Sequence, residues 1–234
     1  MANISIISMN PWLIFSLVFL IIWFFIYILI SKSRKEMLLT SIFTAPFGLT
    51  EPIFVPEYWS PPSLFNLALT TGFDIESIIF SFSIGGIGSV LYEALFSIKH
   101  EKLSRKKMHN KRHNLHLLAL FSPFIVFLIL MPTKLNSIYS VSISLFIGAI
   151  AALLCRPDLK KKTFLGGILF LLLYFVAFLL FTTIYPNAVE QYWNLNALSG
   201  ILILNIPLEE LLFAFTFGMM WSSVYEHITY NKVK

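Results

Sequence analysis

Charged residues are scarce in this chain, and cysteine is almost absent. Asp, Glu, Lys and Arg make up 12% of the 234 residues, whereas hydrophobic residues make up 57%. A chain of this length with so little polar surface is not a water-soluble domain, so we expect an integral membrane protein. The single cysteine, Cys155, excludes an intramolecular disulfide framework, a Cys-only metal site and an iron-sulfur cluster.

Several functional motifs are missing as well. The lack of an aspartate-rich DDxxD pattern argues against a magnesium-dependent intramembrane prenyltransferase. The run Gly85-Gly86-Ile87-Gly88 lies inside an expected helix with no βαβ unit around it, so it is not a dinucleotide fingerprint. Four histidines lie in or beside a basic loop with no Cys near them in the sequence: His100, His109, His113 and His116. We therefore expect no metal site and no cofactor.

Apolar runs of bilayer length predict an all-α integral membrane protein with seven transmembrane helices in a single membrane domain, residues 1–234. The runs cover residues 11–30, 37–55, 73–98, 115–132, 137–155, 163–185 and 201–229. Pro46 and Gly48 interrupt the second run. The seventh helix is expected to begin near Pro207, because proline is favoured in the first turn of a helix.

The distribution of basic residues tests this count independently. With seven spans, 16 of the 17 Lys and Arg residues fall on one side, and only Lys134 falls on the other. By the positive-inside rule, this predicts a multi-pass cell-membrane protein with its N-terminus outside and its C-terminus in the cytoplasm. The basic run 99–112 is then a loop that faces anionic lipid, so the net charge of +5 needs no nucleic-acid partner.

Two segments of the chain resemble one another. FDIESIIFSFSIGGIGSVLYEAL, from Phe73, aligns without a gap on IPLEELLFAFTFGMMWSSVYEHI, from Ile206, at an offset of 133 residues. Four residues before each segment recur at an offset of 134: Pro52, Val55, Tyr58 and Trp59 as Pro186, Val189, Tyr192 and Trp193. The pattern predicts an internal duplication of a three-helix unit, with residues 11–98 as the first repeat and 137–229 as the second. The helix at 115–132 would be a connector that lets both repeats insert in parallel.

Helical geometry separates the matched residues of these segments into two sets. One set shares a face on which small residues permit close approach, and we expect it to pack the two halves together. It comprises Gly85, Ser89, Tyr92, Glu93, Gly218, Ser222, Tyr225 and Glu226. The other set pairs Glu76 with Phe80 and Glu209 with Phe213, and we expect it to point elsewhere, into a cavity.

Carboxyl groups are expected near the outer ends of the helices, with no Lys or Arg beside them. The candidates are Glu51, Asp74, Glu76, Glu209 and Glu210. Because a charged carboxylate is costly at membrane depth, these groups should share protons or bind a cation. A carboxylic acid that stays protonated near neutral pH is a usable general acid. The aromatic loops 56–72 and 186–204 would be interfacial anchors or a lid over a lipid-derived substrate.

The segment Pro207-Leu208-Glu209-Glu210-Leu211-Leu212-Phe213 resembles the PxEExxF signature of the flavin-independent membrane carotenoid cyclases. This family includes the two-subunit bacterial lycopene cyclases, their fused archaeal forms and the cyclase part of the fungal bifunctional enzymes. Its members are built from two similar helical halves, each with such an acidic motif. In the first half of this chain, Asp74-Ile75-Glu76-Ser77 has Asp where Pro is expected and Ser where the second acid belongs.

The resemblance implies a non-redox cyclisation of a linear polyene end group, without a cofactor. A terminal alkene is protonated, a neighbouring double bond attacks the tertiary cation, and the ring then loses a proton. Glu209 and Glu210 would be acid and base, Asp74 and Glu76 a partner pair, and Glu51 a further candidate. Aromatic faces would shelter the cation by cation–π attraction. The expected substrate-binding residues are Phe80, Phe213, Tyr58, Trp59, Tyr192 and Trp193. The substrate would be an isoprenoid or carotenoid from the bilayer, and a homo-oligomer is compatible with the sequence.

Two other classes of protein stay open at this point. A proton-coupled transporter would use the same acids in a relay, marked by polar residues that continue across the midplane. Between Glu76 and Glu93, the chain offers mainly Ser81, Ser83 and Ser89 for such a path. A non-catalytic cyclase-like membrane protein is the third class, because Ser77 replaces an acid of the motif.

Overall fold

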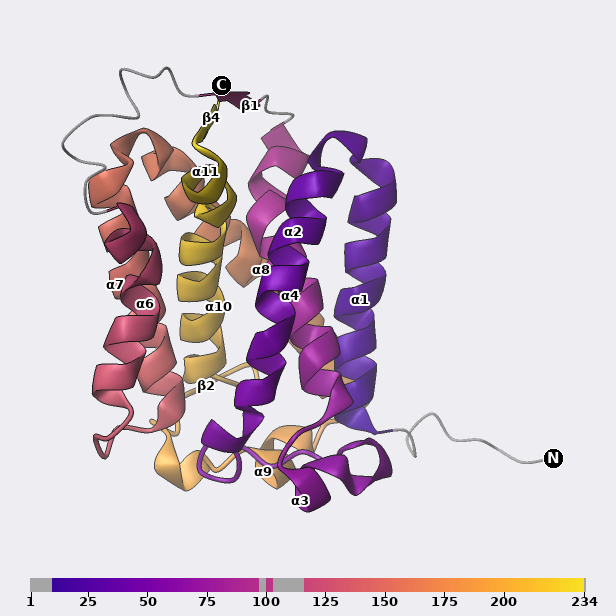
Figure 1. Cartoon of the computed structure of the whole chain (residues 1–234). Coiled ribbons are helices and arrows are strands. Elements are labelled where there is room, and N and C mark those ends of the chain that lie inside the picture. Colours follow the sequence, from indigo (N-terminus) through magenta and orange to yellow (C-terminus); the bar gives the residue numbers. More distant parts are fainter. Residues whose placement is uncertain (1–9, 97–99, 103–115, 234) are drawn as a thin grey trace.

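The computed structural model describes residues 10–96, 100–102 and 116–233, and this part of the chain is largely helical (Figure 1). The main helices are α1 (Pro11–Leu29), α2 (Arg34–Thr44), α4 (Ile75–Phe96), α6 (His116–Leu130), α7 (Ser137–Cys155), α8 (Lys160–Ile184), α10 (Leu208–Trp221) and α11 (Val224–Thr229). Shorter helices connect them: η2 (Ser31–Ser33), η3 (Ala45–Ile53), η4 (Leu64–Asn66), α3 (Leu67–Thr71), η6 (Pro157–Leu159), α9 (Ala188–Tyr192) and η7 (Leu195–Ala197). Two small antiparallel pairs complete the fold: β1 (His100–Lys102) with β4 (Asn231–Val233), and β2 (Leu202–Ile203) with β3 (Ile206–Pro207).

Four helical segments of the described chain are long and apolar enough to cross a membrane. They are α1, α4, α7 and Pro157–Ile184, which joins η6 to α8. Helix α6 is apolar but shorter. Large hydrophobic side chains such as Phe25 in α1 and Leu172 in α8 are exposed, as is expected of surfaces in contact with lipid. The helices therefore support a membrane protein. The orientation of the termini stays a prediction, and the basic run 99–112 lies outside the described residues except at 100–102.

The second and seventh predicted helices differ from the structure. Helix α2 ends at Thr44 and continues as η3, which contains the expected interruption at Pro46 and Gly48. Most of residues 201–206 belong to the turn formed by β2 and β3, so the helix predicted there is wrong. This turn reverses the chain at Leu204 and Asn205, where φ is 51° and 63°. The expected start near Pro207 is confirmed, because α10 begins at the next residue.

The helices form two groups with similar internal packing (Figure 1). Helix α4 packs against α1 and α2, α10 packs against α7 and α8, and α6 lies on α7. Helices α1 and α7 are both 19 residues long. Each follows an Asn, Asn10 or Asn136, whose side chain accepts a hydrogen bond from a backbone N–H of the first turn. These parallels agree with two repeats at 11–98 and 137–229 and a connector at 115–132, a division that stays a prediction.

The small residues of the expected packing face lie between helices of the same group. A Cβ on Gly85 would collide with Thr44 of α2, and a Cβ on Gly218 would lie 2.6 Å from Cβ of Phe170 in α8. These two glycines thus allow α4 to approach α2 and α10 to approach α8, whereas we expected them to join the two halves. The other members of this face are also buried: Ser89, Tyr92, Glu93, Ser222, Tyr225 and Glu226.

Candidate active site

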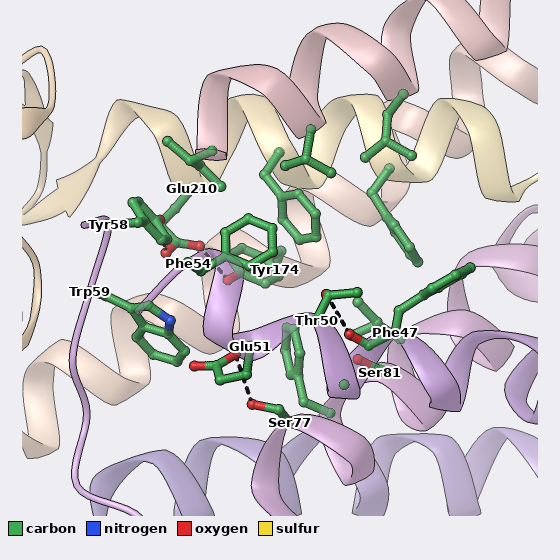
Figure 2. Close-up of a pocket in the computed structure, with 18 of the residues that line it drawn as sticks. Phe47, Thr50, Glu51, Phe54, Tyr58, Trp59, Ser77, Ser81, Tyr174 and Glu210 are labelled. Carbon is green, nitrogen blue, oxygen red and sulfur yellow. Dashed lines mark hydrogen bonds between the residues drawn. The ribbon is translucent and has the colours of Figure 1, made fainter. Parts of the chain in front are cut away.

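A cavity of about 290 Å³ lies between the two groups of helices (Figure 2). Its walls come from α1, η3, α4, α6, α7, α8 and α10, together with the segments that follow η3 and α8. The lining is mostly aromatic and includes all six residues predicted to bind substrate: Phe80, Phe213, Tyr58, Trp59, Tyr192 and Trp193. The volume is at the lower end of the range of about 300–1,000 Å³ that is typical of ligand pockets. The chemistry of its walls suits an apolar ligand.

Two carboxyl groups of the described chain, those of Glu51 and Glu210, line this cavity. Both oxygens of Glu210 accept hydrogen bonds. The Tyr58 hydroxyl and the Trp193 indole N–H donate to Oε1, the latter at 2.8 Å, and the Tyr174 hydroxyl donates to Oε2 at 2.5 Å. Tyr58 lies in a loop, where burial and the neighbouring Glu210 carboxylate raise the pKa of its hydroxyl. Tyr58 therefore keeps its proton and acts as a donor to Glu210.

The carboxyl group of Glu51 has a different environment, although it is also buried. Its Oε2 accepts a hydrogen bond of 3.1 Å from the Ser77 hydroxyl, whereas its Oε1 has no hydrogen-bond partner among the described residues. The indole of Trp12 donates to Ser77 Oγ at 3.3 Å. Because an indole N–H can only donate, the single hydroxyl proton of Ser77 is left for Glu51. The indole of Trp59 lies beside the same carboxyl group (Figure 2).

The other three acids proposed from the sequence do not line the cavity. Oε1 of Glu76 accepts hydrogen bonds from Asn10 Nδ2 at 2.9 Å and Leu64 N at 2.7 Å. In the second group of helices, Oε1 of Glu209 accepts from Ser199 N at 2.8 Å and the Tyr139 hydroxyl at 2.5 Å. The third acid, Asp74, accepts a hydrogen bond on Oδ1 from Ser77 N in the first turn of α4. Glu210 therefore lines the cavity and Glu209 does not. In the first group of helices, Phe80 lines the cavity and Glu76 does not.

Two segments close the cavity at the end of the bundle where α1 begins, which we call the loop end (Figure 1). One segment lies between η3 and η4, and the other lies between α8 and η7. They are joined by a reciprocal pair of backbone hydrogen bonds, from Ser60 N to Tyr192 O at 2.7 Å and from Asn194 N to Tyr58 O at 2.9 Å. Between these bonds lie the two tryptophans of the predicted repeat, with ring centroids 5.2 Å apart: Trp59 and Trp193. Both tryptophans therefore belong to the cavity wall and to the contact between the loops.

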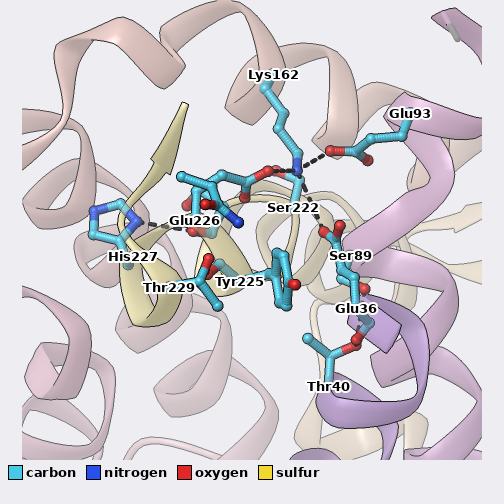
Figure 3. Close-up of polar contacts among 12 residues, drawn as sticks. Glu36, Thr40, Ser89, Glu93, Lys162, Ser222, Tyr225, Glu226, His227 and Thr229 are labelled. Carbon is cyan, nitrogen blue, oxygen red and sulfur yellow. Dashed lines mark hydrogen bonds and ion pairs between the residues drawn. The ribbon is translucent and has the colours of Figure 1, made fainter. Parts of the chain in front are cut away.

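A second polar cluster lies at the opposite end of the bundle, where the chain ends (Figure 3). The Lys162 ammonium, in the first turn of α8, forms ion pairs with Glu93 and Glu226 and lies 3.6 Å from Glu36 Oε1. All four side chains are buried. Lys162 directly precedes the predicted helix 163–185 and was counted only among the basic residues on one side of the membrane. Its three partners are distant in the sequence, and only the fold brings them together.

Histidine and cysteine meet at the same end of the bundle, which the sequence did not predict. Nδ1 of His116 lies 3.4 Å from Cys155 Sγ, and Nε2 lies 2.7 Å from the carbonyl oxygen of His227. Cys155 is distant from His116 in the sequence, and the fold brings the two side chains together. The two ring nitrogens of His227 face the carbonyl oxygens of Ser223 and Ala152, at 2.9 Å and 3.2 Å. Buried histidines that pack between helices have such backbone partners.

Sequence reasoning missed two residues that complete the cavity site. Tyr174 contributes a hydrogen bond to Glu210, and Ser77 contributes one to Glu51. A signal existed for Tyr174, because it lies in the middle of the apolar run 163–185, whereas the other tyrosine of this run, Tyr185, lies at its end. Ser77 was noted only as a missing acid.

Comparison with known proteins gives one match. Residues 136–228 match a protein-family model described as Lycopene cyclase. The matched segment covers less than half of the chain and contains Tyr174, Trp193 and Glu210, but not Glu51 or Tyr58. The search of curated proteins and the search of solved structures each returned no match. The family match supports a relationship to lycopene cyclases.

Proposed function

We propose that this protein is a carotenoid cyclase that closes a ring at the end of a linear, lycopene-like polyene by acid and base chemistry. One observation carries the proposal. Glu210, which lies in the segment that matches the lycopene cyclase model, presents its carboxyl group to a buried aromatic cavity and accepts hydrogen bonds from three side chains. An aromatic cavity with one fixed carboxylate suits a reaction that passes through a carbocation.

The reaction adds one proton to a terminal alkene and removes one proton from the ring, so it is an isomerisation that needs no redox cofactor. The first C–H bond forms at the end of the polyene and leaves a tertiary cation. The electron pair of a neighbouring double bond then forms the ring C–C bond. Finally, a C–H bond beside the new cation breaks, and its electron pair becomes the ring alkene. Glu210 stabilises the cation and accepts this last proton, while Phe80 and Phe213 present their rings to the same cavity.

The wider architecture belongs to the same proposal. We infer seven membrane-crossing segments in two parallel repeats, with α2 and η3 forming one crossing and α10 and α11 another. The loop end would face the outside and the C-terminus the cytoplasm. The boundaries of the family match, 136 and 228, agree closely with those of the second predicted repeat, 137 and 229. A polyene would enter the cavity from the bilayer, because apolar residues of α6 and α7 such as Phe127 and Val141 line it.

The test is expression in a host that accumulates lycopene, with carotenoids resolved by chromatography. The wild-type chain should give cyclic carotenes. Glu210→Gln removes the anionic acceptor but keeps the shape of the side chain, so product should disappear while the protein stays in the membrane. Glu190→Gln is the matched control, because this carboxyl group is exposed in α9, and it should leave the product unchanged. Conversion of lycopene by Glu210→Gln at the wild-type rate would contradict the role of Glu210.

A further inference from the structure

Glu51 and Glu210 reach the same cavity from elements that are distant in the sequence. We propose that Glu51 is the proton donor of the site, so that η3 supplies the acid that the first repeat lacks at position 77. This inference rests on the proposed cyclisation and adds to it the residue that begins the reaction. Glu51 lies outside the segment that matches the lycopene cyclase model.

The position of Glu51 is the first argument. In the alignment of the two repeats, Ser77 of α4 corresponds to Glu210 of α10. The Ser77 hydroxyl donates to Glu51 Oε2 at 3.1 Å, so a carboxyl group lies beside the point on α4 where the second acid of the motif would be. A Cβ on Gly48 would come within 2.5 Å of Ile78 N. The missing side chain at Gly48 therefore lets η3 lie directly on α4, and this contact brings Glu51 to Ser77.

The hydrogen bonds of the two carboxyl groups are the second argument. Three donors occupy three of the about four lone-pair sites of Glu210, and hydrogen bonds to the charged form hold this group as a carboxylate. Glu51 receives the Ser77 hydroxyl on Oε2 and has the Trp59 indole as a further donor beside it, while its buried Oε1 has no hydrogen-bond partner of ordinary geometry among the described residues. A proton on Oε1 of Glu51 displaces no bond. The arrangement therefore suits Glu51 for proton donation and Glu210 for proton acceptance.

The resulting cycle balances. Oε1–H of Glu51 gives its proton to the terminal alkene carbon, and Glu51 becomes a carboxylate. After ring closure, Glu210 takes the proton from the carbon beside the cation. One proton then returns from Glu210 to Glu51 before the next turnover, so the reaction consumes no proton overall. Aromatic side chains that line the same cavity, including Tyr174 and Phe80, would surround the cation.

The first experiment moves the acid. Glu51→Ala should lower the rate of lycopene cyclisation by roughly 100-fold or more, the usual contribution of a general acid. Adding Ser77→Glu to this variant places a carboxyl group on α4 and should restore at least a tenth of the lost rate. Glu57→Ala is the matched control, because this carboxyl group is exposed and does not line the cavity, and it should behave as the wild type. Wild-type activity in Glu51→Ala would overturn the proposal while leaving the cyclase function standing.

The second experiment needs no turnover and covers the case in which the double variant does not fold. The intact wild-type protein in lipid nanodiscs is treated with dicyclohexylcarbodiimide, which modifies protonated carboxyl groups in apolar surroundings. Mass spectrometry of peptides should find the label on Glu51 and not on Glu210. Label on Glu210 alone would overturn the assignment of donor and acceptor. If the wild type leaves lycopene unchanged, the cyclase function fails, and the site of labelling still decides which carboxyl group carries the proton.

Discussion

The buried cluster around Lys162 allows a quantitative prediction about stability. The side chains of Lys162, Glu36 and Glu93 are each 2% exposed, and that of Glu226 is 0% exposed. Lys162→Met keeps a long apolar side chain but removes the ammonium group, which leaves three carboxyl groups without the cation that they surround. Removing one partner of a buried ion pair costs about 3–5 kcal/mol, because the remaining charge stays buried and uncompensated.

This cost can be measured as a change in the melting temperature. For a protein of 150–250 residues, 1 kcal/mol corresponds to about 2–4 °C, so Lys162→Met should melt roughly 6–20 °C below the wild type. The assay is thermal unfolding of the purified protein in detergent micelles, followed by circular dichroism. Lys161→Met is the matched control, because Lys161 is exposed in the same turn of α8, and its effect should stay within about 0.5 kcal/mol.

A compensating variant tests the electrostatic explanation. Replacing Glu36, Glu93 and Glu226 by Met in the Lys162→Met background removes all three carboxylates that pair with the ammonium group. A buried ionic cluster replaced as a whole by apolar groups of similar volume is often as stable as the original, so this quadruple variant should regain most of the lost melting temperature. If Lys162→Met has the melting temperature of the wild type, or if the quadruple variant is less stable than Lys162→Met, the cluster does not stabilise the fold by charge pairing.

Three further changes follow from single contacts. Tyr174→Phe removes a donor to Glu210, and because hydrogen bonds to charged groups are worth about 1.5–3 kcal/mol, cyclisation should slow roughly 10- to 100-fold in a steady-state assay. Gly218→Ala places a Cβ 2.6 Å from that of Phe170 and should lower stability by about 1–3 kcal/mol, measured by the same melting assay. Glu76→Gln weakens the acceptor that Leu64 N uses, so amide hydrogen exchange in residues 60–72 should become faster, and unchanged exchange would mean that Glu76 does not anchor this loop.

Much of the fold follows from local sequence signals. The apolar runs predict where the long helices lie, and the structure gives four of them the length and composition of a membrane span. Pro207 marks the start of α10 to within one residue: it lies at the N-cap, directly before the first helical residue, Leu208. The turn at Leu204 and Asn205 escaped prediction, since residues 201–204 are as apolar as the helix that follows, and the left-handed backbone conformation of the turn is not marked by glycine.

The candidate site was only partly predictable, because neighbouring residues on a helix point in different directions. Glu209 and Glu210 differ by about 100° around α10, so they cannot both face one cavity. The sequence placed Glu209 with Phe213 on the cavity side, but only the phenylalanine lines the cavity. At the first turn of a helix, a carboxylate can turn back to accept a free backbone N–H. Glu209 does this with Ser199 N, and Glu76 does it with Leu64 N.

The site is built from both groups of helices, and neither group contains all of it. Helix α10 brings Glu210, but one of its three donors, Tyr58, comes from the loop after η3. The first group also brings Glu51, held by Ser77 of α4. The segment that matches the lycopene cyclase model therefore contains the carboxylate with most of its hydrogen bonds and lacks the second carboxyl group. In the proposed mechanism, the repeat that departs from the acidic motif at Ser77 contributes through η3, which places a carboxyl group in the same cavity as the one that the motif retains.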